Sequence, residues 1–486
     1  MQPTTGIRRR VRAAAIDFDR IRRELDLTAD FPAAATAEAQ SAADRFADGR
    51  ADRTDIELVT IDPPGSKDLD QALRVVPDGD GFLVHYAIAD VAALVEPGGA
   101  IDAESRERGQ TMYFPDGSVP VHPRPLSEGV GSLLPDEVRP AVLWTVRVDS
   151  SGETTEVGVE RAIVRSRKRF DYAEVMAAHE AGRLHPSIVA LPAFGQTRLA
   201  WSLRRGSVQL DLPDQEIVRH DGGRAWTLQI APRTPADNWN AQVSLLIGMC
   251  AGDIQRRAGI GLLRTVPQAS DEAIAELRSA AKTLGVPWAA DASPGEFLAG
   301  LQADAPTTLA LMTVGARLMR GSGYLTLEPG EHYDAADVVH AGVGGAYSHV
   351  TAPLRRLADR YATEVCLAVT GGREVPDWVT EALPSLRKTM ASSDQLASKA
   401  ERRSVDLTEA TVLADQVGAR FDAVVMRDAN GERPAEVFIS SPAIIGACDG
   451  APAAGTTCTV EVTVADVEEA QVRFAVREEV RAVGTP

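Results

Sequence analysis

In the stretch TIDPPGSKDLDQ, residues 60–71, three aspartates fall within nine residues on a loop rich in proline and glycine. The pattern that follows predicts a strand, so Asp68 and Asp70 share one face of an extended segment. Several carboxylates turned toward one point suit a hard, oxygen-binding ion such as Mg²⁺. Such loops are also typical of solvated turns, and the loop alone fits both interpretations.

The segments around this loop predict a mixture of strands and helices. Residues 72–76 and 82–88 read as two strands joined by a hairpin turn at residues 77–81, and further strands are expected at residues 141–148 and 156–166. Helical patterns then follow at residues 172–181, 193–205, 241–258, 271–284, 307–318, 353–368 and 386–414. Because strands and helices do not alternate regularly, the predicted fold class is α+β.

The two ends of the chain have their own patterns. Two helices are expected at residues 13–25 and 33–46, and short strands at residues 421–426, 435–439, 456–464 and 472–476. About five strands in about 70 residues fit a small barrel of the OB type, which commonly binds oligonucleotides. A structural β-cap is the alternative for this C-terminal part.

Composition is that of an ordinary globular protein, with 486 residues, 44% hydrophobic and 25% charged. No stretch approaches the roughly 18 apolar residues that a membrane helix needs. The basic N-terminus is interrupted by Asp17 and Asp19, which argues against a signal peptide. Four cysteines form no CxxC pair and no zinc spacing, so we expect free thiols in a reducing cytoplasm.

The net charge of −18 argues against a protein coated with positive charge for nucleic-acid binding. It is compatible with an enzyme whose basic residues line an internal channel. Basic side chains do cluster at Arg165, Arg167, Lys168 and Arg169, and adjacent arginine pairs occur elsewhere. Each cluster alone is more often a solvated face, so only a shared channel would make them functional.

Three blocks of sequence resemble the ribonuclease II (RNB) family. The first is TIDPPGSKDLDQAL, followed by VHYAIADVAALVEPGGAIDAESRERGQTMYFPDGSVPVHPRPLSEGVGSLLPDEVRPAVLW. The second, AYSHVTAPLRRLAD at residues 346–359, is similar to the family motif Y-x-H-x-T-S-P-I-R-R-Y-x-D. The third is AERR at residues 400–403. The blocks occur in order and cover roughly residues 50–415, which makes the resemblance specific.

The resemblance implies a large RNB-type catalytic domain with a short N-terminal helical extension and a C-terminal OB-like β-barrel. The expected division is residues 1–50, 51–415 and 416–486. The implied activity is hydrolytic 3′-to-5′ degradation of single-stranded RNA to nucleoside 5′-monophosphates. It also implies Mg²⁺ as cofactor, with Mn²⁺ as an alternative, and a cytoplasmic protein, expected as a monomer without membrane attachment.

The resemblance also assigns candidate site residues. The metal ligands are Asp62, Asp68, Asp70 and, in the place of the family's fourth aspartate, Gln71. The catalytic set is Asp70, Arg355 and Glu401, with Arg355 on the scissile phosphate. The RNA-binding set is Tyr113, Tyr172, Arg169, His349, Thr351, Arg355 and Arg356, in which the tyrosines hold the 3′ end by stacking.

The chain departs from the family pattern at several places. Gln71 brings no charge, so we expect weaker metal binding, and Gln71→Asp should lower the Mg²⁺ requirement. No aromatic residue lies at residues 207–210, where the family's second stacking ring is expected, and Ala352 replaces the usual serine. We expect none of the N-terminal cold-shock domains of typical bacterial members. A catalytically weak RNA-binding or scaffold protein is therefore one alternative, and a DNA-directed nuclease is another.

Overall fold

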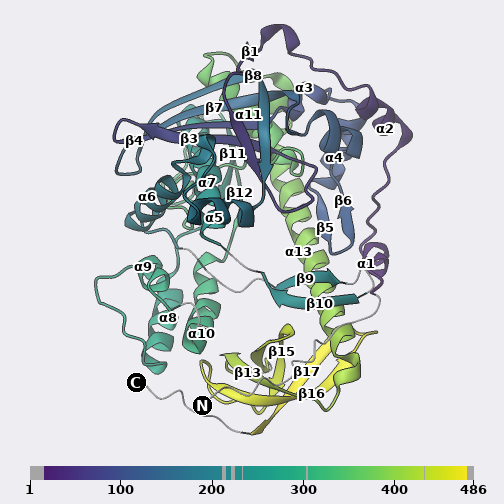
Figure 1. The fold of residues 1–486 in the computed structure, drawn as a ribbon, viewed down its shortest axis with the longest axis vertical. Coiled ribbons are helices and arrows are strands. Elements are labelled where there is room, and N and C mark those ends of the chain that lie inside the picture. Colours follow the sequence, from purple (N-terminus) through teal and green to yellow (C-terminus); the bar gives the residue numbers. More distant parts are fainter. Residues whose placement is uncertain are drawn as a thin grey trace.

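The computed structural model describes residues 16–208, 210, 215–220, 225–231, 234–302, 305–431 and 433–478. Helices and strands are mixed without regular alternation, which confirms the predicted α+β class. A sheet with its covering helices forms one end of the molecule, and a small barrel forms the other (Figure 1). The long helix α13 (Leu383–Leu413) runs between them.

The large sheet has the strand order β1-β8-β2-β3-β4-β7. Its strands are β1 (Ala51–Asp52), β2 (Leu58–Ile61), β3 (Gln71–Asp78), β4 (Gly81–Ala89), β7 (Val138–Val148) and β8 (Thr154–Phe170). Strand β8 is 17 residues long and pairs with β7 along its first part and with β2 near its end. The sheet therefore curls, so that β8 pairs both with β2 and with the edge strand β7. The predicted hairpin is confirmed, with a turn of only two residues because Asp78 already pairs with Gly81.

Helices cover the sheet and bury its apolar face. They include α5 (Tyr172–Glu180), α6 (Leu191–Arg204), α7 (Pro235–Ala258) and α11 (Leu357–Thr370). The main core contains Trp144 and Tyr86 from the sheet together with Phe194 and Trp239 from α6 and α7. Helix α7 begins six residues before the predicted start, because Thr234 and Asp237 form a capping box around Pro235.

The predicted helix at residues 353–368 is wrong at its start, since α11 begins only at Leu357. The four residues before it form a turn. The Asp359 carboxylate accepts a hydrogen bond from the Ala352 backbone N–H (2.7 Å) and pairs with Arg356, which closes this turn. Gln110 forms a β-bridge with Arg356 on its other side. These contacts replace the helical hydrogen bonds that the apolar pattern alone suggested.

Both predicted N-terminal helices are shorter than expected. They are α1 (Asp19–Glu24) and α2 (Ala33–Gln40), and residues 13–15 of the first prediction lie outside the described residues. The second helix ends at Gln40, and in the segment that follows Asp44 accepts a hydrogen bond from the Phe46 backbone N–H (3.0 Å). Such a local bond favours a turn over a further helical turn.

The C-terminal strands form a closed barrel in the order β13-β14-β15-β17-β16. Its strands are β13 (Arg420–Arg427), β14 (Ala435–Ser440), β15 (Ala443–Asp449), β16 (Thr457–Asp466) and β17 (Gln471–Glu478). The predicted OB-like barrel is confirmed, and β15 is a fifth strand that the sequence pattern did not locate. The division of the chain at residues 50 and 415 stays a prediction.

The remaining elements are small. They are α3 (Val91–Leu94), α4 (Ala100–Arg108), β5 (Met112–Phe114), β6 (Gly117–Val119), β9 (Gln215–His220), β10 (Ala225–Ile230), β11 (Gly261–Thr265), α8 (Asp271–Thr283), α9 (Pro294–Ala299), α10 (Pro306–Gly315), β12 (Gly323–Leu327) and α12 (Asp377–Thr380). All four cysteines are buried and free. Across the described ranges, the helices lack the combined length and apolarity that a membrane span requires.

Candidate active site

The carboxylate loop, residues 62–70, joins β2 to β3 and is tied to the end of β8. The Asp62 backbone N–H donates a hydrogen bond to the Phe170 carbonyl (3.0 Å). The Arg169 guanidinium donates to the Ser66 carbonyl (2.7 Å). Arg169, predicted to bind RNA, therefore also supports the loop that carries the predicted metal ligands.

Asp70 is the point at which the first and second sequence blocks meet. Its side chain is 3% exposed. One carboxylate oxygen accepts a hydrogen bond from the Leu354 backbone N–H (2.8 Å), and the other accepts one from Nε of Arg355 (3.1 Å). Burial raises the pKa of Asp70 to about 7, although Arg355 acts in the opposite direction. A further positive charge beside Asp70 would stabilise the ionised form of its carboxyl group.

Asp62 is the second carboxyl in an unfavourable environment. Its Oδ2 is buried and accepts no hydrogen bond. Burial first, and then the charge of Asp68, raise the pKa of Asp62 to about 6. An orphaned acceptor next to a second carboxylate costs free energy unless a donor or a cation lies between them.

Tyr113 extends from a small hairpin formed by β5 and β6 and lies beside the loop. Its side chain is 54% exposed, and its hydroxyl donates a hydrogen bond to Asp68 (3.3 Å). The hairpin is braced by α1, because Arg22 donates to Asp116 (3.1 Å) and lies over the Phe114 ring (4.4 Å). An open aromatic face is thus held next to the carboxylates, as stacking on a terminal base requires.

The second predicted tyrosine is more enclosed. Tyr172 is the first residue of α5, where Asp171 and Glu174 form a capping box. Its ring packs against the main core, and its hydroxyl accepts a long hydrogen bond from Asn240 (3.4 Å). At residues 207–210, Val208 is buried in an apolar cluster and Gln209 lies outside the described residues.

Two other predicted RNA-binding residues have structural partners. Arg356 forms two hydrogen bonds with the fully buried Asp359 (2.5 and 2.8 Å). Thr351 is buried, and its carbonyl accepts a hydrogen bond from the Gln71 side chain (2.6 Å). Both residues therefore shape the turn that presents Arg355, and their contact with RNA stays a prediction.

Gln71 is the predicted metal ligand that the geometry least favours. Its amide nitrogen donates to the Thr351 carbonyl, and its oxygen accepts a hydrogen bond from the Tyr86 hydroxyl (2.7 Å). Because side chains alternate along β3, Gln71 and Asp70 project toward opposite faces. Gln71 thus has partners at both ends of its amide group.

Glu401 and His349 border a different part of the site. Glu401 is exposed on α13 and lines a cavity of about 540 Å³ together with His349 and Arg356. His349 shares a hydrogen bond between its Nδ1 and the Tyr324 hydroxyl (2.9 Å). Burial, assisted by Arg356, holds the pKa of His349 well below its usual value, so the ring is neutral. The structure thus groups Glu401 with His349 and Arg356 and gives it no direct contact with the carboxylate loop.

The carboxylates of the loop are the kind of ligand that a hard dication such as Mg²⁺ prefers. Asp62, Asp68 and Asp70 offer carboxylate oxygens from one loop, and the orphaned Oδ2 of Asp62 is the best-placed free acceptor. Within the described part of the chain, no group of three or more His, Cys, Asp or Glu side chains is gathered closely enough to hold a metal ion. The assignment of metal ligands therefore stays a prediction.

Two supporting residues were missed from the sequence. The Ser132 hydroxyl accepts a hydrogen bond from the Leu69 backbone N–H (2.9 Å) and donates one to the Lys67 carbonyl (2.6 Å). Asp359 organises the turn before Arg355. Asp359 stands at the end of the second sequence block and could have been found there, whereas nothing in the pattern distinguishes Ser132.

Comparison with known proteins supports this account of the fold. A family model described as the RNB domain matches residues 50–369, and one described as the RNase II-type exonuclease C-terminal S1 domain matches residues 419–477. The chain therefore belongs to the RNB family.

Individual relatives are distant. Ribonuclease R of Escherichia coli (strain K12) is 26% identical over 402 residues, which cover 78% of this chain and 48% of that protein. This chain thus spans about half the length of that relative. The solved structure of Mycoplasma genitalium RNase R in complex with ribose methylated single-stranded RNA matches with a TM-score of 0.83 and 18% identity, covering 95% of this chain and 78% of that one. Yeast Ssd1, a pseudonuclease, matches with a TM-score of 0.66 and 16% identity, over 88% and 55% of the two chains.

Proposed function

We propose that this protein is a Mg²⁺-dependent exoribonuclease that degrades single-stranded RNA from its 3′ end and releases nucleoside 5′-monophosphates. The contact between Asp70 and Arg355 carries the proposal. It places an always-charged, planar guanidinium beside the buried Asp70 of the carboxylate loop, where a phosphodiester would need both charge neutralisation and a metal site. RNA as substrate is supported by membership of the RNB family and by the RNA bound to the M. genitalium structure.

Each element of the site has a proposed part. Tyr113 stacks on a base near the 3′ end, which tolerates any base and so suits stepwise degradation. Arg355 donates hydrogen bonds to the scissile phosphate. Asp62, Asp68 and Asp70 hold the metal, and Mn²⁺ is an alternative to Mg²⁺. Glu401 borders the cavity from the α13 side.

The reaction is a hydrolysis in which bound Mg²⁺ would supply an acidified water and a counter-charge for the phosphate. The water oxygen bonds to phosphorus while the bond between phosphorus and the 3′ oxygen breaks. The 3′ oxygen leaves as a hydroxyl with a proton that the water supplies, and the phosphate stays on the 5′ oxygen of the released nucleotide. Arg355 stabilises the negative charge that grows on the phosphate oxygens.

The cellular setting is part of the same proposal. Four buried, free thiols fit a reducing compartment, and we propose that the protein acts in the cytoplasm. We propose a monomer, which light scattering of the purified protein would test.

A catalytically weak RNA-binding protein is the second candidate. It is favoured by Gln71 in the place of a fourth aspartate and by the fold likeness to a pseudonuclease. The three aspartates of one loop and the contact of Asp70 with Arg355 favour the enzyme.

The test is incubation of the purified protein with 5′-labelled single-stranded RNA and Mg²⁺, with products resolved on a gel. The enzyme predicts progressive shortening of the labelled strand from the 3′ end, and chromatography of the unlabelled products should identify nucleoside 5′-monophosphates. Tight binding without shortening would favour the second candidate. Equal degradation of single-stranded DNA would instead indicate a nuclease without selection for the 2′-hydroxyl.

A further inference from the structure

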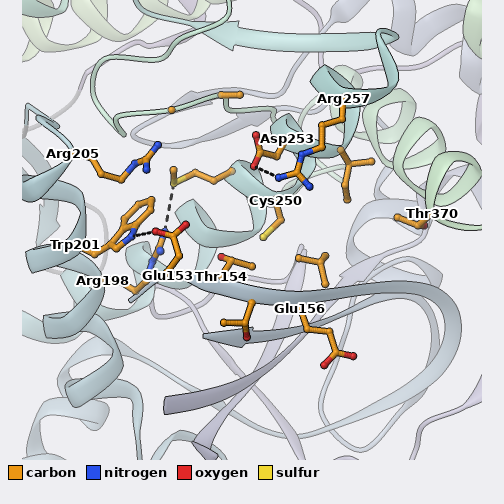
Figure 2. Close-up of a pocket in the computed structure, with 16 residues that line it drawn as sticks. Glu153, Thr154, Glu156, Arg198, Trp201, Arg205, Cys250, Asp253, Arg257 and Thr370 are labelled. Atoms are coloured by element: carbon orange, nitrogen blue, oxygen red, sulfur yellow. Dashed lines mark hydrogen bonds and ion pairs between the residues drawn. The ribbon is translucent and has the colours of Figure 1, made fainter. Parts of the chain in front are cut away.

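A cavity of about 370 Å³ lies between the start of β8, the end of α6 and the C-terminal half of α7 (Figure 2). It is far from the carboxylate loop. Next to the loop, Gln71 pairs with Ile88, and Ile88 pairs with Val142 of β7. At the cavity, Thr154 pairs with Val148 of the same strand. Six residues along a strand at about 3.3 Å each separate the two places by roughly 20 Å.

Arg198 of α6 lines this cavity and is 2% exposed. Its guanidinium donates to the Gly152 carbonyl (2.5 Å) and contacts the Met249 sulfur (3.5 Å), while its Nε has no hydrogen-bond partner. Among the residues described, no carboxylate lies within ion-pair distance of it. Burying a charge without a direct ion pair costs free energy, so the guanidinium of Arg198 is unusual at this buried position.

A second cation faces the same place. Arg198 lies 3.9 Å and Arg205 4.8 Å from the centre of the Trp201 ring, and Figure 2 shows all three at one end of the cavity. Arg205 donates to the Gly344 carbonyl (3.2 Å) and, within the described ranges, has no acidic partner. Burial lowers the pKa of Arg198 to about 10, the charge of Glu153 acts in the opposite direction, and the charge of Arg205 adds to the lowering. Two like charges are thus held side by side.

Of the three carboxylates that line the cavity, two are paired with other arginines and the third, Glu153, has a neutral partner. Glu153 accepts from the Trp201 indole N–H (2.8 Å), and Glu156 pairs with Arg147 (3.1 Å). Asp253 pairs with Arg256 and Arg257 (both 3.2 Å), and Figure 2 shows Asp253 and Arg257 at the opposite end. Glu153 is thus the one carboxylate described at the Trp201 end, and it faces two arginines, which leaves that end of the cavity with a net positive charge. Their guanidinium groups suit an anion with several oxygens.

We propose that this cavity binds a phosphate-class oxyanion between Arg198 and Arg205. Because Trp201 is buried and both arginines lie close to its ring, the site recognises the phosphate and offers no open indole face to a base. The phosphate could come from two sources, free phosphate or a phosphate monoester in solution, or the backbone of an RNA that passes over this face. The inference does not depend on catalysis at Asp70.

The test uses the full chain and inorganic phosphate as the probe, measured by calorimetry at constant ionic strength. Wild type is expected to bind phosphate. Arg205→Met, which changes an exposed side chain, is expected to bind it about tenfold more weakly, the loss of one charge-assisted hydrogen bond. Arg204→Met is the matched control, because Arg204 is also exposed and donates to the Ser151 carbonyl.

A second arm measures single-stranded RNA binding by the same variants. Unchanged RNA binding in Arg205→Met assigns the site to free phosphate. Weakened RNA binding with a shallower salt dependence assigns it to the RNA backbone. Wild type that binds no phosphate, together with RNA binding that Arg205→Met leaves unchanged, would overturn the proposal. Equal losses in Arg204→Met and Arg205→Met would also overturn it.

Discussion

Glu409 on α13 provides a pH-dependent test of how the barrel is attached. Its Oε1 accepts hydrogen bonds from the Gln215 side chain (2.7 Å) and from the Ile445 backbone N–H in β15 (3.2 Å). Burial raises the pKa of Glu409 from 4.5 to about 8, against the lowering effect of the bond from Gln215. The folded protein therefore keeps a proton on this carboxyl that the unfolded chain releases.

The sign of the effect follows from proton binding. Between the unfolded and folded pKa values, the folded state binds more protons, so the free energy of unfolding falls as pH rises. The stabilisation is fully present below about pH 4.5 and is lost as pH rises through about 8. Between about pH 5 and pH 7.5, this single group is expected to remove about 3 kcal/mol.

Glu409→Gln keeps the accepting oxygen and removes the titration. We expect the variant to gain about 3 kcal/mol relative to wild type between about pH 5 and pH 7.5, measured by urea unfolding at each pH. Glu401→Gln, an exposed carboxyl on the same helix, is the control and should follow wild type. If wild type and Glu409→Gln lose stability in parallel across this range, the carboxyl is not held protonated in the folded state.

Three further changes test the site. Arg22→Ala should release the Tyr113 hairpin and raise KM for RNA about fivefold, for a loss of about 1 kcal/mol, and an unchanged KM would show that α1 does not position it. Tyr113→Ala should weaken RNA binding by about 1–3 kcal/mol while Tyr113→Phe retains it, and equal losses would transfer the role to the hydroxyl bond with Asp68. Gln71→Asp should lower stability by about 1–3 kcal/mol, because it loses its donor to Thr351, and leave the Mg²⁺ half-saturation unchanged. A lower Mg²⁺ requirement would instead return position 71 to the metal shell.

The sequence predicted most helices and strands well where capping residues and hydrophobic periodicity indicated the same bounds. Helix α8 (Asp271–Thr283) begins at the predicted residue, because Ser270 caps its start, and it ends one residue before the predicted bound. The same reasoning missed β15, a short apolar run without alternation. Its Gly446 lies against the Phe474 ring, where an added Cβ would come within 2.6 Å. That packing belongs to the closed barrel and leaves no trace in the local pattern.

The meeting of Asp70 with Leu354 and Arg355 lies beyond what spacing can predict. These residues are 284 and 285 positions apart, and only the family resemblance brought their sequence blocks together. The start of α11 was misjudged because the Asp359 carboxylate competes for the backbone before Leu357. Gln71 was assigned as a metal ligand from the family resemblance alone, whereas its bonds to Thr351 and Tyr86 come from residues distant in the sequence.

The central claim is that Asp70 belongs to a metal-dependent ribonuclease site. The most direct measurement is the rate at which wild type and Asp70→Asn shorten 5′-labelled single-stranded RNA, with Mg²⁺ and with a chelator. Asn keeps an oxygen that can accept from the Leu354 N–H but loses the negative charge. The account predicts 3′-to-5′ shortening by wild type that stops with the chelator, and near-complete loss in Asp70→Asn with RNA binding and unfolding free energy retained. A wild-type rate in a correctly folded Asp70→Asn would contradict it.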